Sequence, residues 1–360
     1  GIPVFIGSLA SNLRDQPPLA FLSGDAGAAA PASSAFDSAG RLLAATDSTA
    51  ALAQFRRARD LDVVRFRAPS EFNAIVRRVA SGNSAHYVPV EESFRAAAQY
   101  GIPGHDLILE HVHPNARGYA LLGQAFVESI RASNVFPKAN FSRLRPYPEY
   151  ARRMALTTFD ERIAEHEVQT VITRWPFVPF SKQQDYRGNY TPVDRVDSLA
   201  FLVSRGGITW TNAKSQIAEY YEKSGNIDQA VLEYDGLIRN FPHSERPLSL
   251  AAKTLLDARQ PERATPYLER AIRIQPTGYN TFALGVIALR NREAEKAIPL
   301  LETSLRLAPR NPNAMYQLSL AYAFAKDAGR ARSTALSLYR IAPDFPGLRG
   351  WLSTLGLQAQ

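Results

Sequence analysis

A short run of polar side chains, Glu-His-Val-His-Pro-Asn at residues 110–115, holds the densest chemistry in the chain. Glu110 and His113 are three residues apart, in a segment expected to be a loop between a strand region and a helix. At this spacing a carboxylate can accept a hydrogen bond from one imidazole nitrogen while the other nitrogen faces a nucleophile. The spacing therefore predicts a carboxylate–imidazole pair suited to proton transfer.

Two other roles remain open for the same residues. His111 and His113 alternate, so on a strand they would point the same way and could bind zinc together with Glu110 or His105. Zinc is the less favoured role because no further His/Glu pair stands at metal spacing. The other alternative places His113 at a helix N-terminus, where backbone groups satisfy its side chain.

Other polar residues in the first third carry weaker signals. Ser8 and Ser11 do not lie in a Gly-x-Ser-x-Gly turn, so we expect a strand end and a turn rather than nucleophiles. Arg65 and Arg67 could line an anionic pocket, but strand alternation favours structural salt bridges with Phe66 buried opposite. Surface or loop positions are expected for three histidines: His105, His166 and His243.

The elements that would position these residues alternate between strands and helices. Strands are expected at residues 2–9 and 86–90, an alanine-rich loop at 26–34, and helices at 42–58, 70–79, 92–99 and up to about 130. Such alternation is typical of an α/β fold with a parallel sheet.

A different pattern, with a period of 33 or 34 residues, runs through the last third. It is marked by Pro242, Pro276, Pro309 and Pro343, by Ala230, Ala264, Ala297 and Ala331 twelve residues earlier, and by Tyr221, Leu255, Ala288 and Tyr322 nine residues before the alanines. This period is the tetratricopeptide signature, in which each copy is a pair of helices. Gly285 and the alanines would let the helices approach closely, and each proline would end a helix.

Stacked helix pairs form a superhelix whose concave groove can hold a protein or peptide. The groove candidates are polar positions on the first helix of each pair: Asn212, Gln216, Asn280, Asn313 and Gln317. The alternative is that these side chains are simply solvated. A capping helix with Trp351 is expected within residues 345–357.

Residues 110–119 resemble the last conserved block of the SGNH (GDSL-type) ester hydrolases, and most closely that of a bacterial group carrying tetratricopeptide repeats. This block lies within a matching stretch at residues 101–119, and supporting matches lie at residues 9–18 and 61–75. The resemblance implies that His113 is the general base and Glu110 its orienting acid, although that acid is usually aspartate. It further implies a serine acyl-enzyme acting on an acyl ester that is linked to a carbohydrate or envelope polymer.

The resemblance is incomplete because the sequence contains no Gly-Asp-Ser. Gly24-Asp25-Ala26 has alanine where serine is needed. We therefore expect residues 1–135 to be the C-terminal part of the hydrolase domain, with the nucleophile upstream. A periplasmic chain, or one anchored to the membrane before Gly1, would fit that bacterial group. The alternative is a non-catalytic interaction protein in which the hydrolase fold serves as scaffold.

Composition narrows the function classes. The 360 residues are 45% hydrophobic and 21% charged, as in soluble globular proteins, and no apolar stretch approaches the ~20 residues of a membrane helix. The absence of cysteine excludes disulfides and thiolate chemistry. The net charge of +8 is scattered rather than alternated with aromatics, so neither nucleic-acid binding nor a cofactor is predicted.

Together these observations predict three parts. Residues 1–135 form an α/β domain with a flavodoxin-like sheet, and residues 136–209 form a helical connector with helices at 160–174 and 193–204. Residues 210–360 form an all-α solenoid of about four tetratricopeptide repeats with a capping helix.

Overall fold

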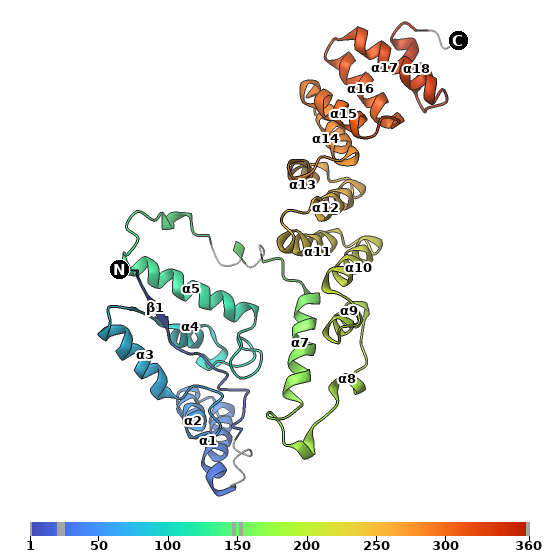
Figure 1. Ribbon diagram of the computed structural model, residues 1–360. Helices are drawn as coiled ribbons and strands as arrows, with labels where there is room; N and C mark the ends of the chain where they lie inside the picture. The colour runs from blue at the N-terminus through green and yellow to red at the C-terminus, as the bar shows by residue number, and fades with distance from the viewer. Residues whose placement is uncertain (1, 20–25, 146–148, 151–153, 358–360) are drawn as a thin grey trace. The chain divides into compact units, whose positions relative to one another are not determined.

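The computed structural model describes residues 2–19, 26–145, 149–150 and 154–357. By its internal contacts the chain divides into two compact units (Figure 1). The first unit comprises Gly1–Arg153 and Thr158–Gly207, and the second comprises Met154–Thr157 and Ile208–Gln360.

In the first unit the elements are β1 (Phe5–Gly7), α1 (Ala26–Ala44), α2 (Ser48–Leu61), α3 (Ser70–Gly82), β2 (His86–Val88), α4 (Val90–Ala97), α5 (Ala116–Ser133), α7 (Thr158–Ile172), α8 (Tyr186–Asn189) and α9 (Arg195–Ser204). Short 3-10 helices lie at Gln99–Gly101, Phe141–Arg143 and Phe180–Lys182. None of the helices in the described part of the chain is long and apolar enough to cross a bilayer.

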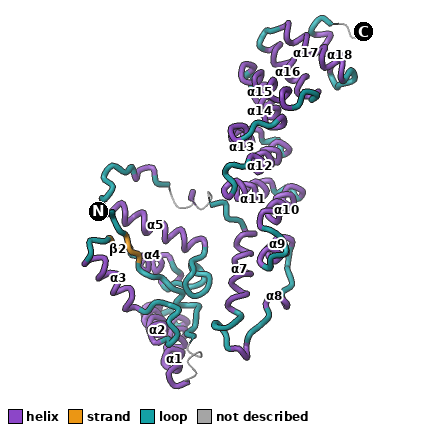
Figure 2. Tube along the Cα trace, viewed as in Figure 1, coloured by secondary structure: helices purple, strands orange, loops and turns teal. Residues whose placement is uncertain are grey.

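The prediction of a flavodoxin-like α/β sheet is wrong. Within the described residues the sheet consists of β1 and β2 alone, paired in parallel with Phe5 opposite His86 and Gly7 opposite Val88. Figure 2 shows how little of the chain is strand beside its helices. Two strands of three residues cannot form the central layer of an α/β domain.

Local side-chain chemistry explains two further corrections. Residues 26–34 are not a loop but the start of α1, consistent with the high helix propensity of alanine. The segment expected as a strand around Arg67 is a turn instead, in which Asp62 accepts hydrogen bonds from the backbone N–H groups of Leu19 and Val64. As a result Arg67 is buried and Phe66 is 43% exposed, the reverse of the expected alternation.

The helix α7 buries Phe159 and His166, whereas its Val171 is 49% exposed. The surface position predicted for His166 is wrong, because Nδ1 lies 2.7 Å from the Tyr186 hydroxyl and Nε2 lies 3.0 Å from Asp197 Oδ1. Asp197 and Tyr186 therefore satisfy a histidine that would otherwise be costly to bury, and Tyr190 in turn donates its hydroxyl to Asp197.

The second unit is a row of helix pairs (Figure 1). Its helices are α10 (Trp210–Lys223), α11 (Ile227–Asn240), α12 (Glu245–Asp257), α13 (Pro261–Ile274), α14 (Gly278–Arg290), α15 (Ala294–Leu307), α16 (Pro312–Phe324), α17 (Ala328–Ile341) and α18 (Leu348–Thr354). The second helix of each pair ends two residues before a marker proline, and the four marker alanines are fully buried. The predicted repeat phase is confirmed.

Close contacts between helices explain the small residues of the repeat. A Cβ at Gly285 would lie 2.8 Å from Leu301 Cγ, so glycine allows α14 to approach α15. The expected capping helix is α18, whose Leu348 and Leu352 complete the core under α16 and α17. Trp351 Nε1 donates to Ser319 Oγ at 2.8 Å, which ties the cap to α16.

Candidate functional site

The turn that follows β1 is the framework of the candidate site. Buried Asn73 on α3 binds both backbone groups of Leu9, accepting from its N–H at 2.7 Å and donating to its carbonyl at 3.0 Å. Asn12 then donates its backbone N–H to His111 O at 2.9 Å and its Nδ2 to Glu110 O at 2.8 Å. These bonds hold the loop that carries Glu110 and His113 against the turn.

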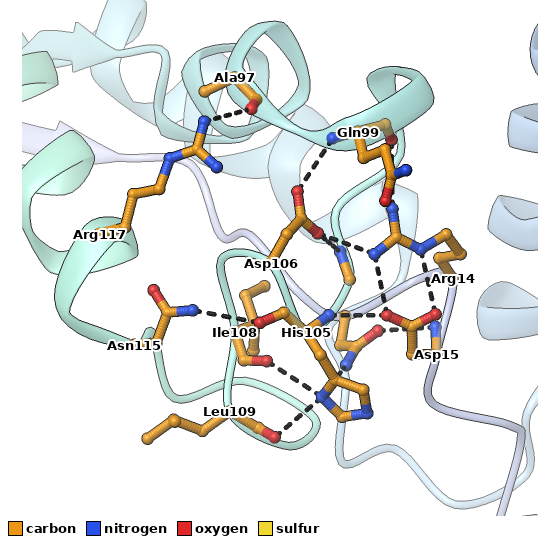
Figure 3. A network of polar contacts seen from close by, with 12 residues as sticks. Arg14, Asp15, Ala97, Gln99, His105, Asp106, Ile108, Leu109, Asn115 and Arg117 are labelled. Carbon is orange, nitrogen blue, oxygen red and sulfur yellow. Dashed lines mark hydrogen bonds and ion pairs between the residues drawn. The ribbon is translucent and has the colours of Figure 1, made fainter. Parts of the chain in front are cut away.

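A charged network locks the other side of this loop (Figure 3). Arg14 Nη2 donates to Asp106 Oδ1 at 2.9 Å and to Asp15 Oδ2 at 3.0 Å, and His105 N donates to Asp15 Oδ2 at 2.7 Å. Burial alone would raise the pKa of Asp15, but the hydrogen bonds from Arg14 and the His105 backbone lower it. Gly104 is needed here because a Cβ would collide with the Arg14 and Asp15 side chains.

The loop is closed at its base by backbone pairing. Ile108 and Pro114 form an isolated antiparallel bridge, and Leu109 N donates to His113 O at 2.8 Å. Asn115 follows as the N-cap of α5, accepting from Gly118 N at 3.0 Å. Residues 108–114 are therefore a tight loop that delivers its side chains just before a helix.

Glu110 is the buried centre of this loop, with 6% of the residue exposed. Its carboxylate accepts the backbone N–H groups of Val112 at 2.9 Å and His113 at 3.2 Å, as well as that of His111. Burial alone would raise the pKa of Glu110, but its interactions with the nearby His111, the Val112 N–H and His113 outweigh burial and lower the pKa to about 2. The group is thus a fixed anion at neutral pH.

His113 is paired with this anion through Nδ1 and Glu110 Oε1. Its side chain is nevertheless 67% exposed. When Nδ1 is hydrogen-bonded to a carboxylate, the proton sits on Nδ1 and Nε2 keeps a lone pair. The arrangement can therefore accept a proton at Nε2 from a group outside the loop. His113 also lies before α5 rather than in its first turn.

His111 occupies a different environment from His113. Its side chain is only 17% exposed, and its ring centroid lies 5.6 Å from that of Phe66 and 5.2 Å from that of Phe177. Nδ1 lies against Glu110 Oε2 without hydrogen-bond geometry. Among the described residues no three His, Cys, Asp or Glu side chains are grouped to hold a metal ion, so the structure lends no support to the zinc alternative.

Of the two candidate hydroxyls, that of Ser8 is hydrogen-bonded within the described structure and that of Ser11 is not. Ser8 follows β1 and its Oγ accepts the Glu91 N–H at 2.9 Å, as expected for a strand end. Ser11 lies in the turn with 5% exposure, and its Oγ finds no hydrogen-bond partner among the described atoms. Gly24 and Asp25 lie outside the described residues.

The groove candidates of the repeats are distributed over three helices and differ in accessibility. Asn212 and Asn313 are exposed, and Gln216 and Gln317 are half-buried. Asn280 is completely buried and donates Nδ2 to Ser249 Oγ at 2.9 Å, so it joins α14 to α12. Asn280 is therefore polar because it makes this hydrogen bond between repeats, and it does not lie on an exposed surface.

Sequence reasoning missed Arg67 as a support of the site. Its Nη1 donates to Asn12 O at 2.8 Å and to Gln16 O at 2.7 Å, which fixes the turn from beneath. Burial lowers the pKa of Arg67 to about 10, and Asp62 partly compensates. No local pattern around Arg67 signals this role, because its partners lie more than 50 positions earlier.

Comparisons with known proteins identify only the repeats. The tetratricopeptide repeat family model matches residues 249–300 and 282–346. No curated protein matches the chain. A crystal structure of MamA is 20% identical, covering 40% of this chain and 80% of that one with a TM-score of 0.39. YrrB, described as a TPR protein with an unusual peptide-binding site, is 19% identical, covering 45% and 84% with a TM-score of 0.37.

The chain therefore contains tetratricopeptide repeats in its second unit, as the period predicts. The structural likenesses are too low to carry an argument of their own. Nothing in the comparisons matches the first unit to an ester hydrolase.

Proposed function

We propose that this chain is an interaction protein whose tetratricopeptide repeats bind another protein or a peptide. The observation that carries the proposal is the array α10–α17, in which four helix pairs keep one phase and bury the marker alanines. Such arrays expose an extended surface formed by many helices, which suits the recognition of a partner segment. The first unit would then act as a scaffold.

Selection of peptides by the full chain from a displayed random library tests this proposal. Fluorescence polarisation would then give the dissociation constant of the selected peptide. Asn212→Ala with Asn313→Ala, both exposed on first helices, should weaken binding by roughly tenfold. Glu269→Ala, exposed on α13, is the matched control and should leave the constant unchanged. The proposal fails if no peptide is selected. It also fails if the double asparagine variant and the Glu269→Ala control bind the selected peptide with the same dissociation constant.

The pair formed by Glu110 and His113 supports a second candidate, general-base hydrolysis of an acyl ester that is linked to a carbohydrate. A buried anion that fixes an exposed imidazole is the arrangement such chemistry requires. Its weakness is the nucleophile, because the sequence lacks Gly-Asp-Ser and Ser8 is engaged with the backbone.

Ester hydrolysis distinguishes the two candidates. With p-nitrophenyl acetate we expect the 360-residue chain to give no turnover above buffer, and His113→Ala to be indistinguishable from it. Turnover that is abolished by His113→Ala and by a fluorophosphonate label would favour the hydrolase.

A further inference from the structure

A pocket of about 460 Å³ lies between α2, α3 and the start of α4, on a part of the first unit that neither proposed function uses. Arg56, Arg77 and Arg78 line it together with the hydroxyl-bearing Ser70 and Ser81. Glu91 is its lining carboxylate. The lining thus carries more positive than negative charge, and it contains no aromatic ring.

Most hydrogen-bond donors of these arginines have no acceptor among the residues that the structure describes. Arg56 donates Nη2 to Glu91 Oε1 at 2.8 Å, while its Nε is buried without a partner in the described structure. Arg77 donates through Nη2 alone, to Glu92 Oε1 at 2.5 Å and Tyr87 Oη at 3.1 Å. Arg78 makes no hydrogen bond or ion pair with any residue that the structure describes.

We propose that this pocket binds the phosphoryl group of a phosphate ester. Guanidinium groups present planar pairs of donors that match phosphate oxygens, and a phosphoryl group offers three acceptor oxygens and up to two charges to several arginines at once. A single carboxylate offers two oxygens and one charge, which Glu91 already supplies to Arg56. The lining contains no aromatic ring on which a base could stack, and Ser70 and Ser81 add hydroxyl groups beside the arginines.

The pocket is coupled to the framework of the first unit. Asn73 donates Nδ2 to Glu91 Oε2 at 2.9 Å while it holds both backbone groups of Leu9. A ligand bound on Arg56 and Arg78 therefore stabilises the packing of α2 and α3 against the turn after β1. Because a ligand that binds only the folded state raises its stability, occupancy is measurable by thermal unfolding.

The test measures the binding of inorganic pyrophosphate to the full chain by titration calorimetry and by the shift in melting temperature. Citrate serves as the carboxylate probe. Vesicles of phosphatidylcholine, with or without phosphatidic acid, distinguish a lipid headgroup from a soluble phosphate. Arg78→Gln removes a guanidinium that has no partner in the described structure, so it should not disturb folding. Arg57→Gln, exposed on α2 outside the pocket, is the matched control.

We expect pyrophosphate, or the phosphatidic acid vesicles, to bind and to raise the melting temperature or co-sediment the chain. Arg78→Gln should weaken this binding about tenfold, and Arg57→Gln should not. The proposal is overturned if neither phosphate source binds, if citrate binds as tightly as pyrophosphate, or if Arg57→Gln loses as much affinity as Arg78→Gln.

Discussion

Lys214 and Glu233 form an ion pair with 2.7 Å between Nζ and Oε2, and both side chains are almost completely buried. Thr157 completes the cluster, since its Oγ1 donates to Glu233 Oε2 at 3.1 Å and lies 3.1 Å from Lys214 Nζ. Gly236 leaves the space that the Lys214 side chain fills, because a Cβ there would collide with Lys214 Cε. The first repeat is thus built around a charge pair that depends on a residue from before α7.

Removing one partner of this pair should be costly. Lys214→Met leaves the Glu233 carboxylate buried without its cation, and we expect a loss of about 3–5 kcal/mol in the free energy of unfolding of the second unit. Urea unfolding followed by circular dichroism measures it. Lys253→Met, at an exposed pair, should cost less than about 1 kcal/mol. Equal effects of the two changes would contradict the buried pair.

The same cluster predicts where an independent repeat fragment must begin. We expect a fragment of residues 154–360 to fold by itself and to be more stable than a fragment of residues 208–360. The longer fragment keeps Thr157, whereas the shorter one exposes Lys214 and Glu233 to water. Thermal melts of the two fragments check this, and identical melting temperatures would show that residues 154–157 contribute nothing. The predicted division at residues 1–135, 136–209 and 210–360 remains a proposal.

Overpacking at the small residues of the repeat should destabilise the array. Ala264→Phe and Gly285→Leu each insert atoms where α13 or α14 packs closely, and a Cβ at position 285 would lie only 2.8 Å from Leu301 Cγ. We expect a loss of about 1–3 kcal/mol for each change. Gln317→Ala, at a half-buried site, is the control and should leave the melting temperature nearly unchanged. Tolerance of both large residues would mean that the repeat phase is wrong.

Glu110 should make the stability of the first unit depend on pH. Its pKa is about 2 in the folded protein against an ordinary 4.5, so its contribution is complete above about pH 5 and is lost as pH falls toward 2. Glu110→Gln should therefore cost on the order of 3 kcal/mol at pH 7 and little at pH 2.

Urea unfolding of the two proteins between pH 2 and pH 7 gives this difference directly. Glu71→Gln, exposed in the first turn of α3, is the matched control and should give a difference that hardly changes with pH. If the difference in the free energy of unfolding between the wild-type protein and Glu110→Gln stays constant from pH 2 to pH 7, Glu110 is not a fixed anion.

Local patterns in the sequence determined the repeat array and the pairing of Glu110 with His113. Each repeat packs mainly on its neighbours, so a period of about 34 residues with buried alanines and terminating prolines specifies both the helix pairs and their stacking. Glu110 and His113 are three residues apart, and one closed loop suffices to bring them together.

Contacts between residues far apart in the sequence were decided only by the tertiary structure. The extent of the sheet depends on which segments pair, and alternating apolar residues near position 65 could not reveal that Asp62 would turn the chain. Arg67 and Lys214 look like surface charges in the sequence. Their partners come from other elements, and a charge is tolerated in the interior only where such partners meet in three dimensions.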